Sequence, residues 1–494
     1  MAAAPRLQLN TLAAVLTTCI FGVVILLLRS VIPSTHALPV FVAIALFAVG
    51  SAAISHYDPH LRADPRAARI FTLLPLLVLA ASSVLYLIRL QESAPPTEAY
   101  AWDSKHIGEL GRLSHEHRYW MDGRLDEWVF VLFNQGLFAF GYDDTPVEEK
   151  GLLYFYSALL RIAGDFNTYL LVVANCAAQV LSSWLLLRIV VQFAPRKAAF
   201  GAAALLLVMP DSVYWGGAFI HKDNFVVCLV LLCLWSALKA FASPSASWRY
   251  SVVFAGSLIA LAFIRSGLVV PLICGGVFAI ALIRKSPLER LSRYAVSLAV
   301  GVAVVAAVLP ATAARDLQKK VFDRVYYKLT EGSSYKLDVQ NITFRASADE
   351  SLIYRLSGGN LSLKKLHYVP VRVAMYFIAP FPPWPIRTGV DYFVLPSTWI
   401  LIPLWFLFLR GCWKGLAQHS DAAVWALSFF LVLSVAVAFA GGFVHERYRV
   451  LLMPFYLGFA ALGESRSSRR QQLWLLLAAA LTFFAGLALY WMLK

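Results

Sequence analysis

The sequence predicts an all-α protein, a polytopic bundle of about 13 transmembrane helices, and three observations predict it. The 494 residues are 60% hydrophobic and only 14% charged, and a soluble protein of this length could not keep its surface polar with so few charges. Apolar runs of around 20 residues recur along the chain, and each is long enough to cross about 30 Å of hydrocarbon. The basic residues gather in short loops between these runs, as expected for cytoplasmic loops.

The expected spans follow directly from these apolar runs: 11–33, 37–55, 69–90, 167–192, 198–217, 223–242, 250–264, 267–283, 294–312, 394–410, 421–443, 448–464 and 472–492. No small-residue cleavage signature follows the first run, which is interpreted as a retained span rather than a signal peptide. Two aromatic-rich segments, 128–141 and 151–163, are expected to be helices in the outer interface. The segment 368–385 ends in four prolines within six residues, which indicates a re-entrant or interfacial element facing outward, with Arg387 just beyond it.

One orientation places every short basic loop in the cytoplasm, with the N-terminus inside and the C-terminus outside. The loops are those at 62–69, 196–197, 284–293, 410–414 and 466–470. The same orientation places the large loops 91–166 and 313–393 outside the cytoplasm. The second of these is rich in Lys and Arg, but long loops follow the positive-inside rule weakly.

Net charge and cysteine usage exclude several classes of partner and cofactor. The charge of +15 is explained by the basic loops at the membrane surface, so membrane lipids and no nucleic acid are expected as partners. The six cysteines form no CxxC pair, so neither disulfides nor a cysteine metal site is expected. No cofactor is certain, and a divalent cation is left open.

Ionisable residues at the ends of apolar spans are the candidate functional groups, because a charge in or near hydrocarbon is costly unless it has a role. The first group follows the third span and contains Asp103, His106 and Glu109, spaced so that they share one face of a helix. A solvated loop with interfacial charges is the alternative interpretation of this group.

The second group, in the stretch MPDSVYWGGAFIHKDNFVV, contains Asp211, His221, Lys222 and Asp223 around a short outer connection. Lys222 and Asp223 are expected to begin the next helix, whose backbone N–H groups favour an anion. The alternative is that Asp223 is only a first-turn acid and that Lys222 extends toward the lipid headgroups.

Two further groups carry arginines on the predicted outer side. Arg265 interrupts a long apolar stretch beside Ser-Gly, where a tight hairpin is expected. His445, Glu446, Arg447 and Arg449 lie together between two spans, and arginine binds phosphate through two parallel hydrogen bonds. The alternatives are an arginine extending to headgroups and a charged turn with an internal Glu–Arg pair.

The pattern resembles the GT-C glycosyltransferases, multi-span enzymes that use polyprenyl-phosphate-linked sugars outside the cytoplasm. In that family an acidic residue follows a span and opens the first outer loop, as Asp103 does after 69–90. The stretch 150–190 is similar to the family's loop-end helix, turn and next span, and 210–223 is similar to its later Pro…Ser…Lys-Asp region. HERYRVLLMP resembles a late Arg-Tyr…Pro segment.

The resemblance covers residues 69–465, which are expected to form the GT-C-like catalytic module with outer loops 91–166 and 313–393. Residues 1–68 are expected to be accessory spans and 466–494 a C-terminal span. The family pattern has two adjacent acids in the first loop, whereas Ser104 follows Asp103 here, so a metal held by an acidic pair is not implied.

The resemblance implies that Asp103 is the catalytic base that takes a proton from an acceptor hydroxyl. Cationic groups would hold the departing phosphate, where negative charge develops. The substrate-binding residues implied are His106, His221, Lys222, Asp223, Arg265, Arg387, His445, Glu446, Arg447 and Arg449.

The expected function is transfer of a sugar from a polyprenyl-phosphate-linked donor to a glycan or lipid-linked acceptor, in cell-surface glycan assembly. The expected location is a bacterial inner membrane with the site facing the periplasm or exterior. One alternative is a Wzy-type polymerase of O-antigen or exopolysaccharide, which uses undecaprenyl-pyrophosphate-linked units. Another is a transporter or flippase for lipid-linked sugars, although the sequence lacks the inverted repeats typical of transporters.

Overall fold

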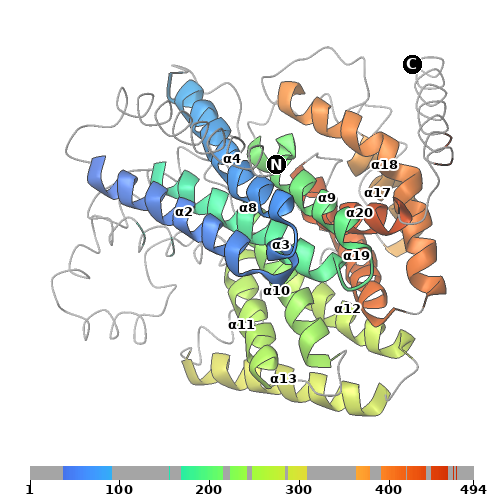
Figure 1. Cartoon of the computed structure of the whole chain (residues 1–494). Helices are drawn as coiled ribbons and strands as arrows, with labels where there is room; N and C mark the ends of the chain where they lie inside the picture. The colour runs from blue at the N-terminus through green and yellow to red at the C-terminus, as the bar shows by residue number, and fades with distance from the viewer. Residues whose placement is uncertain are drawn as a thin grey trace, which may run out of the picture. The chain divides into compact units, whose positions relative to one another are not determined.

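The structure is a computed structural model in which every described element is a helix. It describes residues 37–91, 155, 159, 169–214, 223–241, 248–283, 287–308, 363–378, 391–418, 420–440, 447–464, 471 and 474 (Figure 1). Within them, seven helices are long and apolar enough to cross a membrane, and Val269–Leu282 is a shorter apolar helix. The predicted all-α, multi-span architecture is therefore confirmed, whereas the count of about 13 spans stays a prediction.

The chain divides into two compact units, and the first combines parts of Met1–Gly123, Leu153–Trp184 and Ala203–Phe225. Its N-terminal helices are α2 (Ala37–Tyr57), the single turn α3 (Pro59–Arg62) and α4 (Pro65–Gln91). Asp58 begins α3 by accepting hydrogen bonds from the backbone of His60 and Leu61, at 2.8 and 3.2 Å. The first unit also contains part of α8 (Tyr169–Val190), the end of α9 (Arg196–Val208) and the start of α10 (Asp223–Phe241).

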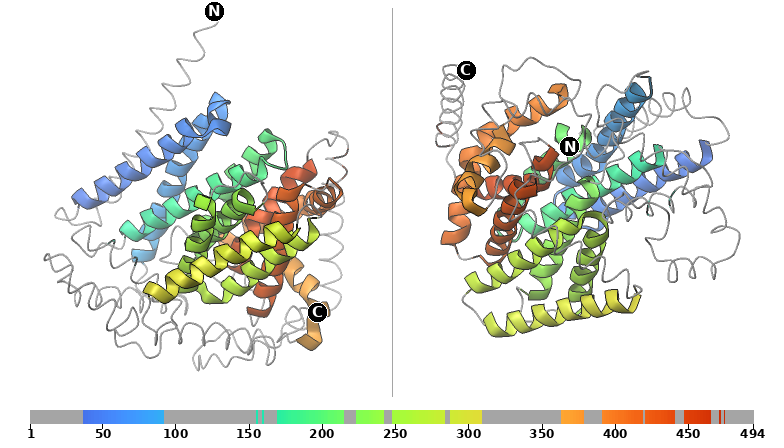
Figure 2. Two further views of the ribbon diagram at one scale, coloured as in Figure 1. Left: turned by 90° about the horizontal axis from the view of Figure 1, so that it is seen from below. Right: turned by 180° about the vertical axis from the view of Figure 1, so that it is seen from behind.

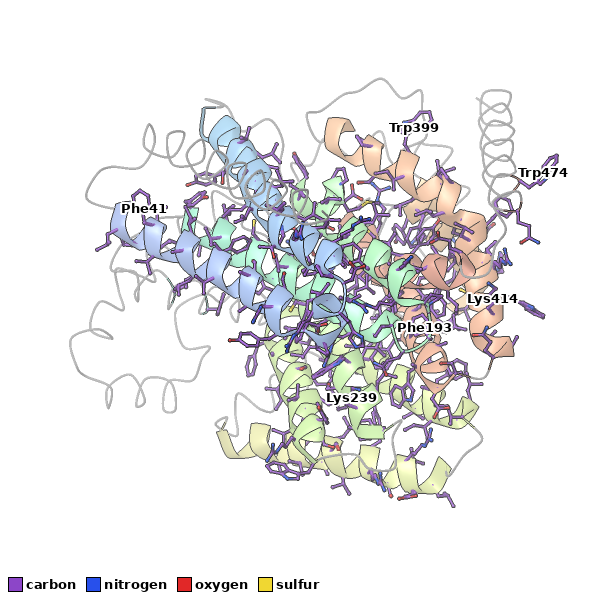
Figure 3. All side chains as sticks on the ribbon, viewed as in Figure 1. Phe41, Phe193, Lys239, Trp399, Lys414 and Trp474 are labelled. Atoms are coloured by element: carbon purple, nitrogen blue, oxygen red, sulfur yellow. The ribbon has the colours of Figure 1, made fainter. Side chains whose placement is uncertain are left out.

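The surface of α2 shows why this helix suits a lipid environment. Large apolar side chains project from it, including Leu38 at 72% exposure and Leu46 at 68%. Figure 3 shows Phe41 pointing outward from the same helix, and Trp399 likewise from α18 (Asp391–Ala417). Apolar surface of this extent is rare on soluble proteins and is expected where a helix meets hydrocarbon.

The second unit is formed by Arg124–Leu152, Leu185–Ala202 and Val226–Lys494. Its helices after α10 are α11 (Trp248–Arg265), a 3₁₀ turn (Ser266–Leu268), α12 (Val269–Leu282) and α13 (Pro287–Val308). They are followed by the 3₁₀ turn Leu363–Tyr368, then α17 (Val369–Ile378), α18, α19 (Asp421–Ala440) and α20 (Arg447–Glu464). The hairpin expected beside Arg265 is present as the turn between α11 and α12.

Within this unit α18 and α20 approach each other unusually closely, and Figures 1 and 2 show the two helices side by side. Gly411 and Gly463 form the contact, because a Cβ atom on Gly411 would lie 1.8 Å from the Phe459 carbonyl oxygen. A Cβ atom on Gly463 would lie equally close to the Leu407 carbonyl oxygen. Small residues at a crossing allow membrane helices to pack backbone against backbone.

The close approach is extended by polar and aromatic contacts. Lys414, labelled in Figure 3, lies 3.4 Å from the terminal carbonyl oxygens of α20, those of Leu462 and Gly463. A lysine is well suited to this position because the C-terminal carbonyls of a helix lack intrahelical partners. Phe193, also labelled, stacks on Phe459 with 5.7 Å between ring centroids.

The structure adds detail to two predicted segments. The predicted span 198–217 is interrupted, because α9 ends at Val208 and Pro210 follows a non-helical Met209. Proline lacks an N–H donor and disfavours a helical residue before it, which explains the end of α9. Part of the predicted interfacial element 368–385 is the helix α17, whose Val369 packs in a buried cluster with Ala438 and Phe439 of α19.

Candidate functional site

One face of α8 carries buried polar side chains at successive helical turns. Asn175, Gln179 and Ser183 are each four residues apart, so they form a single stripe, and each is 2% exposed or less. The Gln179 amide donates to the Leu207 carbonyl oxygen at 2.7 Å, and the Ser183 hydroxyl donates to the Ala203 carbonyl oxygen at 2.6 Å. This polar face of α8 therefore holds the last turns of α9.

The helix is interrupted at Met209, immediately after these turns. Residues 212–214 form a wide, π-type turn after Pro210, and such turns occur frequently at functional sites. Asp211 and Ser212 lie in this segment and are 0% and 2% exposed. A carboxylate buried beside apolar helices is costly unless other groups stabilise it, and Asp211 does interact with other groups of the chain.

The start of α10 brings a second carboxylate into the first unit. Asp223 is the first residue of α10 and is 5% exposed. It lies at the N-terminus of α10, where the partial positive charge of the helix attracts acidic groups. The neighbouring Asn224 donates from its amide to the Asn175 carbonyl oxygen and to the Gln179 side-chain oxygen, both at 3.3 Å.

The first unit thus contains six buried polar residues, called the buried polar cluster below, of which Asn175, Gln179 and Asn224 are joined by hydrogen bonds: Asn175, Gln179, Asp211, Ser212, Asp223 and Asn224. It combines two carboxylates with amide and hydroxyl groups. Carboxylates can accept protons or hydrogen bonds from substrate hydroxyls, and amides can bind sugar hydroxyls as donors and as acceptors. These are the chemical groups with which proteins bind sugar hydroxyls.

The second unit contains two arginines that are fully buried. Arg449, in the first turn of α20, donates to the Thr398 hydroxyl of α18 at 2.7 Å. Arg372, in α17, donates to the Ala438 carbonyl oxygen near the end of α19 at 2.8 Å. Buried guanidinium groups require hydrogen-bond acceptors or anions, and an anionic lipid phosphate is a chemical match for them.

Four of the residues predicted for the site lie in described segments. Asp223 belongs to the buried cluster of the first unit, and Arg449 belongs to the second unit. Arg265 is the last residue of α11 and is partly buried. Arg447 begins α20, and its backbone alone is described. The other predicted site residues lie outside the described residues: Asp103, His106, His221, Lys222, Arg387, His445 and Glu446.

Within the described part of the chain, no three His, Cys, Asp or Glu side chains lie close enough to hold a metal ion. A divalent cation stays an open part of the sequence prediction.

Sequence reasoning did not select Asn175, Gln179 and Asn224, because it searched for ionisable residues. Neutral amides inside an apolar span also carry a cost, since each N–H and C=O group needs a partner in hydrocarbon. Arg372 was not selected because its segment was expected to lie in the interface. A search for any polar side chain at helical spacing in an apolar run would have found the polar face of α8.

The described polar cluster lies within the segment that matches a known family. Residues 151–312 match the model of the dolichyl-phosphate-mannose-protein mannosyltransferase family, which belongs to the GT-C glycosyltransferases. No curated protein matches the chain. The matched segment contains the polar face of α8, both buried carboxylates and Arg265. Residues 151–312 are therefore similar to a family of GT-C membrane glycosyltransferases, in agreement with the resemblance that the sequence patterns indicated.

Proposed function

We propose that the protein transfers a sugar from a polyprenyl-phosphate-linked donor to a glycan or lipid-linked acceptor on the extracytoplasmic side of the membrane. The observation that carries this proposal is the buried polar cluster around Asp211 and Asp223, within the segment that matches the mannosyltransferase family. A cluster of carboxylates and amides at the end of apolar helices suits a substrate with a sugar head and a lipid tail.

Asp103 is the general base in this proposal. Transfer requires removal of a proton from the acceptor hydroxyl, and a carboxylate at the mouth of the bundle can accept it. His106 or Lys222 would keep the Asp103 carboxylate ionised, because a nearby cation favours the charged form.

Cationic side chains at the ends of the spans would hold the departing phosphate. Arg449 is buried and hydrogen-bonded to Thr398, so its guanidinium is already oriented before any substrate arrives. Arg265, Arg387 and Arg447 belong to the same predicted outer side, and His221, His445 and Glu446 complete the binding group. Charge stabilisation of this kind acts where negative charge develops in the transition state.

The localisation follows from the orientation of the spans. In the proposed topology the cluster faces the periplasm or exterior of a bacterial inner membrane, and the reaction contributes to cell-surface glycan assembly. The test is glycan analysis of cells with and without the gene, together with mass spectrometry of the lipid that co-purifies. A polyprenyl-phosphate sugar in the purified protein and a missing glycan in the deletion strain are expected. An unchanged surface glycan with no bound polyprenyl lipid would contradict the proposal.

The role of Asp103 has its own test. Asp103→Asn keeps the shape of the side chain and removes the base, so transfer should fall by about 10²–10⁴-fold. Expression and binding of the lipid donor should stay near the wild-type level. Asp122→Asn, in the same outer loop, is the matched control and should retain activity. If Asp103→Asn keeps more than about half of the activity when chemistry limits the rate, Asp103 is not the base.

A further inference from the structure

Gln179 uses both ends of its amide to connect two separate helices. Its nitrogen donates to the Leu207 carbonyl oxygen in the last turn of α9, at 2.7 Å. Its oxygen accepts from the Asn224 amide in the first turn of α10, at 3.3 Å. Asn224 also donates to the Asn175 carbonyl oxygen at 3.3 Å, which attaches the start of α10 to α8 a second time. One side chain of α8 therefore holds the end of α9 and the start of α10.

These contacts lie immediately beside the two buried carboxylates. Asp211 follows Leu207 by four residues in the sequence, and Asp223 directly precedes Asn224. Asp211 does not belong to α9, which ends at Val208, but to a short helical segment that begins at Pro210 and continues into the π-type turn 212–214. The position of Asp211 relative to Asp223 therefore depends on contacts with other helices. The Gln179 amide of α8 provides one hydrogen bond to the end of α9 and one to the start of α10.

We propose that Gln179 is a positioning residue for sugar transfer, which fixes the two buried carboxylates relative to each other by hydrogen-bonding the ends of α9 and α10. This inference rests on the proposed function, because it assumes that Asp211 and Asp223 face the reacting substrate. A misplacement of about 1 Å can reduce an enzyme's rate by roughly 10²-fold, so modest loosening of the two ends is sufficient.

Ser183 provides a matched control on the same helix face. It is fully buried and bonds the same helix pair, donating to the Ala203 carbonyl oxygen at 2.6 Å. It lies one turn further from the carboxylates than Gln179 does, and it has no hydrogen bond to α10 among the described contacts. Loss of the Ser183 bond should therefore weaken helix packing without disturbing the two carboxylates.

The test compares Gln179→Leu with Ser183→Ala in the purified full-length protein. Gln179→Leu, which keeps the side-chain size, should lower kcat by roughly 10²-fold with little change in KM for the lipid donor. Ser183→Ala should stay within about twofold of wild-type kcat, although both variants lose one helix-holding side chain. Gln179→Glu retains the oxygen that accepts from Asn224 and should be intermediate. Equal losses of kcat in Gln179→Leu and Ser183→Ala would overturn the proposal.

Hydrogen–deuterium exchange provides a readout that does not depend on the proposed function. Backbone amides of residues 207–214 should exchange faster in Gln179→Leu than in Ser183→Ala. If exchange is the same in both variants, Gln179 does not position this segment, whatever the transfer assay gives. If exchange differs and the wild-type protein transfers no sugar, the positioning is upheld and the proposed function fails. If Gln179→Leu does not fold, the same comparison is made between Gln179→Glu and Ser183→Ala.

Discussion

Substitution of Gly411 by alanine tests the packing that unites α18 and α20. The added Cβ atom would lie 1.8 Å from the Phe459 carbonyl oxygen and 2.6 Å from its carbonyl carbon. Real Cβ atoms are not found within 3.0 Å of such neighbours, so the two backbones must separate by roughly 1.2 Å, the difference between 1.8 and 3.0 Å. The obstacle is backbone rather than a flexible side chain, so a rotamer change cannot relieve it.

Two opposing effects determine the magnitude. Overpacking of a well-packed contact costs typically about 1–3 kcal/mol. Replacing glycine by alanine inside a helix stabilises it by roughly 0.5–1 kcal/mol, because the unfolded chain loses freedom. Because the clash involves backbone on both helices, we expect the upper part of the packing cost and a net loss of about 2 kcal/mol.

The assay is thermal unfolding of the purified protein in detergent, with Gly256→Ala as the matched control. Gly256 lies in α11, and a Cβ atom there would meet nothing within 4 Å. The control should therefore be as stable as wild type or slightly more so, while Gly411→Ala melts at a lower temperature. The Arg449–Thr398 contact lies about 20 Å along α18 from Gly411, so transfer per folded molecule should persist. If Gly411→Ala is as stable as Gly256→Ala, the described crossing of α18 and α20 is wrong.

Two further predictions concern Arg449 and the orientation of the chain. Thr398→Val keeps the side-chain shape and removes one hydrogen-bond acceptor of Arg449, so the free energy of unfolding should fall by about 1.5–3 kcal/mol in thermal unfolding, whereas Thr398→Ser should retain most of it. Equal stability of the Val and Ser variants would show that the hydrogen bond contributes nothing. A cysteine introduced at Ser286 should label from the cytoplasm, because the basic loop 284–293 is predicted to be cytoplasmic. A cysteine introduced at Ser333 should label from outside, because the same orientation places the loop 313–393 there. The opposite labelling pattern would reverse the proposed side of the reaction.

Hydropathy predicted most of the helices, because a span needs a long apolar run whatever it packs against. The helices α2, α8, α10 and α19 begin and end within a few residues of the predicted spans. The end of α9 was missed although Pro210 is visible in the sequence, because the apolar run continues past it. The length of the apolar run therefore predicted that a helix exists here. It did not predict the residue at which the helix ends.

The candidate site was less predictable, because its contacts join residues far apart in the chain. Asp223 and Arg449 were selected as charges at span ends, and both are buried. Arg449 donates a hydrogen bond to Thr398, 51 residues earlier, and no local pattern connects the two. The amides of α8 were overlooked because a neutral side chain in an apolar run gives a weaker signal than a charge.

The most direct test of the central claim is sugar transfer by the purified protein in liposomes that contain a synthetic polyprenyl-phosphate sugar and a candidate glycan or lipid-linked acceptor. The account predicts a glycosylated acceptor together with an equal amount of free polyprenyl phosphate, in the wild type and not in Asp103→Asn. Movement of the lipid-linked sugar across the bilayer without cleavage of the sugar–phosphate bond would contradict the account and identify a transporter.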